Sequence, residues 1–226
     1  MRACLVDALG TLVELEPPAP RLRAALAERG VEVSAQRARA AMAAEIAHYR
    51  AHHLEGRDRR SLGALRTRCT EVLRDALGPP AHGLALPELR SVLLESLRFR
   101  AFADAAPALE ALRRAHVRTV VVSNWDVSLH DVLAGCGLAR RVHGTITSAE
   151  VGAAKPDRRL FEHALTLAGV PASAAVHVGD RPREDVEGAL AAGIEPILLD
   201  RAGAAPAPAP GVRVIGSLAE LPPLAA

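Results

Sequence analysis

Polar side chains that could do chemistry follow three short apolar runs of the sequence and precede one helical segment. They are Asp7 and Thr11, Ser123 and Asn124, Lys155, and finally Asp180 and Asp185. The apolar runs predict short buried strands, and ligands of a parallel sheet bind at the carboxyl ends of its strands. We therefore expect these groups to face one crevice.

This set combines three carboxylates, one ammonium group and two hydroxyls. Carboxylates suit a hard cation, and Mg²⁺ commonly takes one or two of them together with substrate phosphate. Lys155, Ser123 and adjacent backbone N–H groups would hold phosphate oxygens and neutralise charge during an in-line transfer to Asp7. The residue types therefore predict a magnesium-assisted transfer of a phosphoryl group to Asp7.

Asp7 and Lys155 stand out by their surroundings in the sequence. Asp7 ends the apolar run Cys4-Leu5-Val6 and precedes Gly10, which indicates a buried strand leading into a tight turn. A carboxylate in an apolar setting is costly unless a cation or hydrogen bonds compensate it. Lys155 is the single lysine among 28 Lys and Arg residues, and lysine differs from arginine in its compact point charge. We interpret Lys155 as a site residue.

The elements that must position these groups alternate along the second half of the chain. Strands are expected at 118–122, 144–147, 174–178 and 197–199, and helices at 104–115, 127–134, 156–168 and 183–192. Strands separated by helices of this length predict a parallel, doubly wound sheet of the α/β class. The strand that ends at Asp7 is expected to belong to the same sheet.

The segment between that first strand and the alternating region has a different pattern. Residues 17–99 show no alternation with a period of two, which indicates an all-helical insertion. Helices are expected at 21–29, from Ser34 to about Leu54, from the Gly56–Asp58 turn to near Gly78, and at 87–98. The sequence therefore predicts a core formed by residues 1–16 and 100–226, with residues 17–99 inserted in it.

Four motifs, taken in order, resemble those of the haloacid dehalogenase superfamily of aspartyl-nucleophile hydrolases. They are Asp7-x-x-x-Thr11, Ser123-Asn124, Lys155-Pro156 and Gly179-Asp180-x-x-x-x-Asp185, and the resemblance covers essentially residues 3–200. The insertion resembles the cap of the subgroup that carries an α-helical cap between the first two motifs. The resemblance implies a Rossmann-like core with the Asp7 strand central, an Mg²⁺ cofactor and an aspartyl phosphate formed on Asp7.

The resemblance also implies a role for each matching position. Thr11 and Ser123 would assist phosphoryl binding, Asn124 would bind substrate, Lys155 would stabilise Asp7 and the transferring group, and Asp7, the backbone carbonyl of Leu9, Asp180 and Asp185 would hold the metal. We expect the substrate to be a phosphorylated metabolite.

Leu9 departs from the pattern of the resembling phosphatases. These read D-x-D-G-T, and the second Asp protonates the leaving oxygen and later activates water, whereas this chain reads Asp7-Ala8-Leu9-Gly10-Thr11. A leucine side chain can do neither, and loss of such proton transfer costs on the order of 10²- to 10⁴-fold in rate. We therefore expect weak or restricted phosphatase activity.

Three functions stay open at this point. The first is a phosphohydrolase that uses a good leaving group or borrows a proton carrier from Glu45, His48, His52 and His53, which lie at helical spacing. The second is a 2-haloacid dehalogenase, whose relatives carry a non-acidic residue at the position of Leu9 and whose leaving halide needs no proton. The third is a binding or regulatory protein on this fold. Retained metal carboxylates favour the first, because they are costly without a cation.

His177 precedes Gly179-Asp180 on an expected strand. We interpret it as a side chain facing a helix interface rather than as a catalytic group, because geometry must come first for that role.

Composition narrows the class of partner. The net charge of +2 and the aromatic content of 2% argue against a nucleic-acid surface. Three widely spaced cysteines without a C-x-x-C motif indicate neither disulfides nor zinc, and no window approaches 18 unbroken apolar residues. We expect a soluble, cytoplasmic protein that acts on a small molecule.

Overall fold

The structure, a computed structural model, describes residues 2–204 and 210–221. The chain forms two compact units, Met1–Glu14 with Arg100–Ala226 and Leu15–Phe99, which we call the core unit and the helical unit. The units divide within two residues of the expected domain boundaries. No helix in the described part of the chain is long and apolar enough to cross a membrane.

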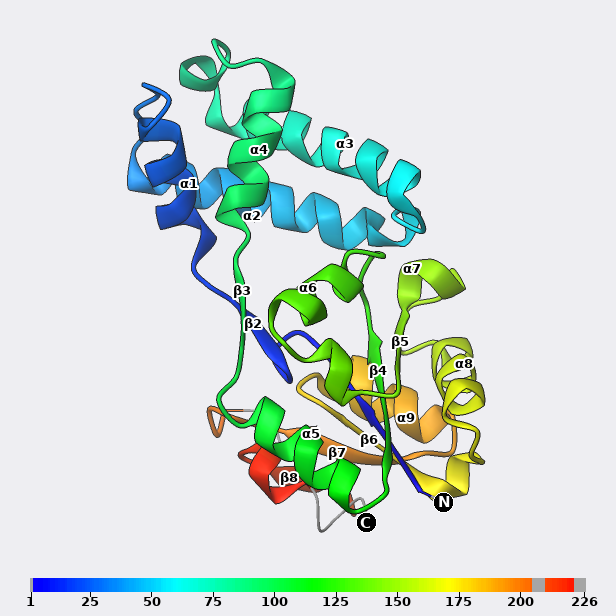
Figure 1. The fold of residues 1–226 in the computed structure, drawn as a ribbon. Coiled ribbons are helices and arrows are strands. Elements are labelled where there is room, and N and C mark those ends of the chain that lie inside the picture. The colour runs from blue at the N-terminus through cyan, green and yellow to red at the C-terminus, as the bar shows by residue number, and fades with distance from the viewer. Residues whose placement is uncertain (1, 205–209, 222–226) are drawn as a thin grey trace. The chain divides into compact units, whose positions relative to one another are not determined.

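A six-stranded parallel sheet forms the centre of the core unit (Figure 1). Its strands are β1 (Ala3–Val6), β4 (Arg118–Ser123), β5 (Gly144–Thr147), β6 (Ala175–Gly179), β7 (Glu195–Leu199) and β8 (Arg213–Ile215), in the order β5-β4-β1-β6-β7-β8. Strand β1 pairs with β4 on one side and with β6 on the other. The predicted α/β class and the central place of the first strand are confirmed.

Helices lie in the connections between β1, β4, β5, β6 and β7, as parallel pairing requires. They are α5 (Ala105–Arg114), α6 (Leu129–Gly135), α7 (Ser148–Val151), α8 (Arg158–Ala168) and α9 (Gly188–Ala191), and a π-helical turn, Pro182–Glu187, precedes α9. Leu160 and Phe161 of α8 pack with Leu5 of β1 and Val120 of β4 in one buried cluster. All four residues of β1 are buried, which explains its continuous apolar sequence.

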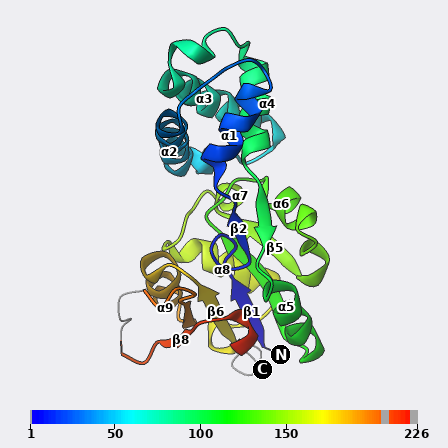
Figure 2. The ribbon, with the colours of Figure 1, turned by 90° about the vertical axis from the view of Figure 1, so that its left-hand side faces the viewer.

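The helical unit contains α1 (Pro18–Ala27), α2 (Ala35–His52), α3 (Arg59–Leu77) and α4 (Leu86–Ser96) (Figures 1 and 2). The Ser34 side chain accepts a hydrogen bond from the Arg37 N–H and starts α2, and Asp58 starts α3 through a capping box. Apolar side chains of the four helices share one buried cluster, which includes Leu22, Met42, Leu73 and Leu93. The insertion is thus helical, as its sequence predicts.

Two short strands that the sequence did not indicate lie where the chain passes from one unit to the other. They are β2 (Val13–Leu15) and β3 (Phe99–Ala101), and they form a separate two-stranded sheet. Glu14 and Arg100 make an ion pair of 2.9 Å beside it. Strands of three residues are too short to show a period of two.

Candidate active site

The Asp7 carboxylate lies at the carboxyl end of the central strand. The Asp7 backbone N–H donates to the Val178 carbonyl at 2.9 Å, which continues the pairing of β1 with β6 up to the carboxylate. The residue is only 5% exposed. Burial raises the pKa of Asp7 above its ordinary value, and the charge of Lys155 opposes that rise.

A tight turn follows Asp7 and brings the chain against Asp180. Gly10 has a φ of +87°, a left-handed conformation that favours glycine. A Cβ atom at Gly10 would also run into the Asp180 carboxylate. Gly10 is therefore required both by its backbone conformation and by the close approach of a site carboxylate.

The Lys155 ammonium bridges two carboxylates. Its Nζ lies 2.6 Å from Asp7 Oδ1 and 2.5 Å from Asp185 Oδ1. The Lys155 side chain is 2% exposed, and burial alone would lower its pKa, but the charges of Asp185 and Asp7 outweigh burial and raise it. The ammonium is therefore held charged between the two acids.

Ser123 distinguishes the two oxygens of Asp7. Its hydroxyl, at the end of β4, donates to Asp7 Oδ1 at 3.0 Å. Ser123 and Lys155 thus converge on Oδ1, and neither of them donates to Oδ2. Oδ2 is therefore the oxygen with which Asp7 would attack as a nucleophile.

Thr11, in the turn that follows Asp7, has a buried hydroxyl group. Its side chain is fully buried, and among the described residues its Oγ1 has no hydrogen-bond partner. The Thr11 carbonyl accepts from Arg201 Nη2 at 2.9 Å, and Arg201 is itself held by both oxygens of Asp104. An unpartnered buried hydroxyl is uncommon and is consistent with a group that meets a ligand.

The Asn124 side chain contacts the main chain of Lys155 at both ends of its amide. Asn124 Nδ2 donates to the Lys155 carbonyl at 3.0 Å, and Asn124 Oδ1 accepts from the Lys155 N–H at 2.7 Å. The structure thus shows a positioning contact that the sequence did not indicate. Substrate binding by Asn124 stays a prediction, for which one N–H of the amide is left.

Asp185 is almost fully engaged by protein donors. Its Oδ1 accepts from Lys155 and from His177 Nε2, the latter at 2.9 Å, and its Oδ2 accepts from the Arg181 N–H at 2.9 Å. Burial raises the pKa of Asp185, but Lys155 and His177 together outweigh burial and hold it well below the ordinary range. A carboxylate has about four acceptor positions, so about one is left for a metal.

Asp180 is the least satisfied of the three acids. Its Oδ1 is buried and lacks a hydrogen-bond partner within the described part of the chain. Burial, followed by the charges of Asp7 and Asp185, raises the pKa of Asp180 to about 6. A bound cation would stabilise the ionised form of this carboxylate.

A hard divalent cation fits this cluster. Asp7, Asp180 and Asp185 each offer an oxygen, and these oxygens lie within 4.8 Å of one another. Lys155 Nζ pairs with Asp7 and Asp185, Arg181 Nε lies 3.7 Å from Asp180 Oδ2, and Asp180 Oδ1 has no hydrogen-bond partner among the described residues. Oxygen ligands with excess negative charge are the donor set that Mg²⁺ prefers. The Leu9 side chain is 37% exposed, and the predicted use of its carbonyl as a ligand stays a prediction.

The proposed proton carriers differ in burial: Glu45 is buried, whereas His48, His52 and His53 are partly exposed. Glu45 is 3% exposed and belongs to the interior of the helical unit. The rings of His48 and His52 contact each other at 4.4 Å, and His52 Nδ1 lies 2.9 Å from Glu55. The buried Glu45 is thus separated in environment from the histidines.

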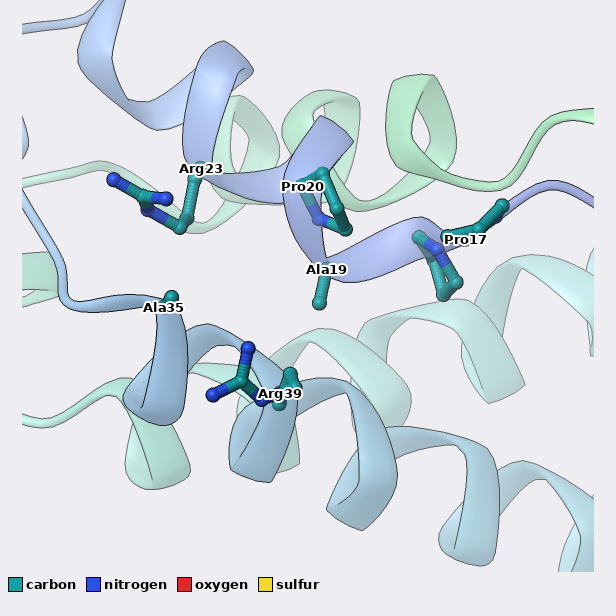
Figure 3. Close-up of a pocket in the computed structure, with 7 residues that line it drawn as sticks. Pro17, Ala19, Pro20, Arg23, Ala35 and Arg39 are labelled. Carbon is teal, nitrogen blue, oxygen red and sulfur yellow. The ribbon is translucent and has the colours of Figure 1, made fainter.

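A shallow cavity of about 340 Å³ lies elsewhere in the helical unit (Figure 3). Residues of α1 and α2 and the proline run before them line it, and Arg23 and Arg39 extend beside it (Figure 3). None of the carboxylates described above lines this cavity.

Two functional contacts escaped the sequence reasoning. His177 reaches Asp185, and Arg201 reaches the turn after Asp7. A period of two on β6 places His177 on the opposite face from Val176 and Val178, which is a signal that could have drawn attention to it. Nothing local marks Arg201, because its partner lies 190 residues away.

The sequence profile of haloacid dehalogenase-like hydrolases matches residues 1–193. The chain is 34% identical to haloacid dehalogenase-like hydrolase domain-containing protein 3 of Danio rerio over 140 residues, which are 58% of this chain and 57% of that protein. It is 36% identical to a phosphoserine phosphatase of Thermus thermophilus over 132 residues, which are 58% of this chain and 52% of that protein. The chain thus spans between half and three-fifths of the length of these relatives.

Among solved structures, the fold is similar to that of a 2-haloacid dehalogenase from Pseudomonas syringae. The TM-score is 0.69 at 26% identity, and the match covers 99% of this chain and 98% of that chain. The chain is thus similar in sequence to a protein named as a phosphatase and similar in fold to one named as a dehalogenase.

Proposed function

The chain belongs to the haloacid dehalogenase-like hydrolase family, and from this premise we propose that it is a magnesium-dependent phosphohydrolase with Asp7 as its nucleophile. One observation carries the proposal. Three buried or half-buried carboxylates lie together, Lys155 Nζ pairs with two of them, and Oδ1 of the third, Asp180, has no hydrogen-bond partner in the described chain. A dehalogenation needs no cation at this place, whereas a phosphate ester brings further negative charge that a cation must offset.

In the first step, Asp7 Oδ2 attacks phosphorus. A new Oδ2–P bond forms, the bond from phosphorus to the leaving oxygen breaks, and Asp7 becomes an aspartyl phosphate. Ser123 and Lys155 hold Oδ1 and thereby orient the carboxylate. Because the Leu9 side chain has no acidic proton to transfer, the leaving oxygen takes its proton from water. This restricts the enzyme to good leaving groups.

In the second step, water hydrolyses the aspartyl phosphate and regenerates Asp7. The Thr11 hydroxyl would donate to a phosphoryl oxygen, and its burial without a hydrogen-bond partner among the described residues supports this role. Lys155 stays charged and offsets the negative charge that develops beside Asp7. Leu9 cannot activate the water, so this step is also expected to be slow.

The metal would be held by Asp7, Asp180 and the Leu9 carbonyl, with Asp185 contributing its remaining acceptor position. When bound, Mg²⁺ supplies positive charge that stabilises the phosphoryl oxygens and lowers the pKa of its neighbouring carboxylates. The unpartnered Asp180 Oδ1 supports this assignment.

We assign the helical unit the role of a cap that selects the substrate, a small phosphorylated metabolite of the cytoplasm. This rests on the helical character of residues 15–99 and on the relative named as a phosphoserine phosphatase.

The test is release of phosphate from acetyl phosphate and p-nitrophenyl phosphate, with and without EDTA. We expect turnover that needs added Mg²⁺ and disappears in Asp7→Asn. Turnover that survives EDTA or survives Asp7→Asn would overturn the proposal.

A 2-haloacid dehalogenase is the second candidate, because Leu9 replaces the acid that a phosphatase uses and a structure of that activity is 26% identical. It predicts halide release from 2-chloropropionate in the presence of EDTA, and it predicts that Asp180→Asn retains this activity. If neither reaction occurs but a ligand raises the melting temperature, the protein is a binding protein on this fold.

A further inference from the structure

A fully buried histidine lies behind the carboxylate that holds Lys155. His177 is in β6 and is 0% exposed. Its Nε2 is 2.9 Å from Asp185 Oδ1, the same oxygen that accepts from Lys155 Nζ at 2.5 Å. Lys155 in turn reaches Asp7 at 2.6 Å. His177, Asp185, Lys155 and Asp7 therefore form an unbroken series of hydrogen bonds that ends at the nucleophile.

We propose that His177 is a positioning residue, whose Nε2–H fixes Asp185 and thereby the Lys155 ammonium against Asp7. An ionised carboxylate has no proton to donate, so the hydrogen in the His177–Asp185 bond belongs to Nε2. The other ring nitrogen, Nδ1, is buried and has no hydrogen-bond partner in the described part of the chain. No acceptor is therefore available for a proton on Nδ1, and the structure assigns the Nε2–H tautomer.

The imidazole is fixed by packing as well as by its hydrogen bond. The Phe161 ring meets it edge to face, with centroids 5.0 Å apart and an interplanar angle of 86°. Phe161 is itself fully buried, and a Cβ atom at Gly188 would lie only 2.7 Å from its Cε2. The contact with this closely packed ring opposes rotation of His177 away from Asp185.

The position of Lys155 depends on this support. Asp185 Oδ2 accepts from the Arg181 N–H, and Oδ1 accepts from both His177 and Lys155. Without His177, Oδ1 would keep only its bond to Lys155, and the carboxylate could rotate about Oδ2 and carry the ammonium with it. Misplacement of a catalytic group by about 1 Å can cost on the order of 10²-fold in rate.

The first test does not use activity. Because Lys155 is the only lysine of the chain, protein labelled with ¹³C,¹⁵N-lysine gives one lysine spin system, whose side-chain signals report this site. We expect His177→Leu to shift the Lys155 Cε and Nζ signals, and His177→Gln, whose amide N–H₂ can donate in place of Nε2, to return them toward the wild-type values. Histidine ¹⁵N spectra of the wild type should show Nε2–H for His177.

The second test is kinetic, and this arm alone rests on the proposed function. We expect His177→Leu to lower kcat about 10- to 100-fold with KM changed less than about threefold, and His177→Gln to restore most of kcat. His177→Asn, whose amide is too short to replace Nε2, is the matched control and should not restore it.

Three results would overturn the inference. They are an Nδ1–H tautomer of His177, a Lys155 signal unmoved in His177→Leu, and equal kcat values for the Leu and Gln variants at equal melting temperatures. If the wild type shows no phosphatase turnover, the proposed function fails, while the two spectroscopic results still decide the role of His177.

Discussion

Leu9 leaves the groups around the Asp7 carboxylate unchanged, but it removes the side chain that would transfer protons. The carboxylate, its Lys155 and Ser123 donors and the metal-compatible acids are all in place around Asp7. The side chain at position 9 is partly exposed and carries no transferable proton. The residues that we propose hold and stabilise a phosphoryl group are thus separable from the residue that would transfer its protons.

This separation leads to a prediction at a single residue. Leu9→Asp supplies the missing carboxyl group and should raise the phosphatase kcat by about 10²-fold or more, since general acid–base groups contribute on the order of 10²- to 10⁴-fold. Leu9→Asn is the control, because it adds a polar group of similar size that cannot transfer a proton. Equal rates in Leu9→Asp and the wild type, with Asp7→Asn inactive, would show that protons come from another group.

Single elements explain why part of this arrangement was predictable. Strands β1, β4 and β6, which lead to Asp7, Ser123 and Asp180, are short and mainly apolar, so the local sequence pattern is enough to locate them. The positions of the site side chains follow, because parallel strands end at one edge of a sheet. Helix boundaries shift where a side chain caps the backbone: α8 begins at Arg158 because the Asp157 carboxylate accepts from the Arg159 N–H.

The unpredicted part depends on contacts between distant segments. The expected helix at 183–192 begins as a π-helical turn, in which the Asp185 and Val186 N–H groups both donate to the Arg181 carbonyl. π turns of this kind often occur at functional sites. The Asn124 amide looked free for substrate because its partner, the Lys155 main chain, lies 31 residues away. Sequence patterns carry no record of such pairs.

The Asp7 turn gives a prediction for one element. Gly10→Ala should lower the free energy of unfolding by more than about 1 to 2 kcal/mol, which is the cost of a left-handed non-glycine residue, because its methyl group also displaces the Asp180 carboxylate. Mg²⁺-dependent activity should fall at least about 10-fold. Gly30→Ala is the matched control: Gly30 has a φ of +74° and no atom within 4 Å of a Cβ. If the two variants behave alike in urea unfolding and turnover, contact with Asp180 is unimportant.

At the scale of the whole molecule, each unit carries its own spectroscopic reporter. The single tryptophan, Trp125, is in the core unit, and the single tyrosine, Tyr49, is in the helical unit. Trp125 is buried, and Tyr49 packs against the apolar cluster of the four helices. The response of each unit to metal and to pH can therefore be followed separately.

Magnesium should stabilise the unit that contains the carboxylates. A ligand present at about 100 times its Kd adds about 2.7 kcal/mol to the free energy of unfolding, so Mg²⁺ should raise the melting temperature reported by Trp125 fluorescence. Asp180→Asn should abolish the increase, because it removes the charge of the least satisfied acid. An equal increase in Asp180→Asn and the wild type would place the ion elsewhere.

Glu45 should make the helical unit sensitive to pH. Burial raises its pKa to about 7 from the model-compound value of 4.5, so the folded unit binds the proton more tightly than the unfolded chain. Stability should therefore fall as pH rises from 4.5 to about 7, with a total loss of about 3 kcal/mol above that range.

Glu45→Gln should remove most of this loss of stability. At about pH 8 it should raise the unfolding free energy that ¹⁹F-tyrosine NMR reports at Tyr49, and at about pH 4 it should change little. Glu32→Gln removes an exposed carboxylate of the same unit and serves as the control. If the free energy of unfolding depends on pH in the same way in Glu45→Gln and the wild type, the ionised Glu45 carboxylate is stabilised by other groups.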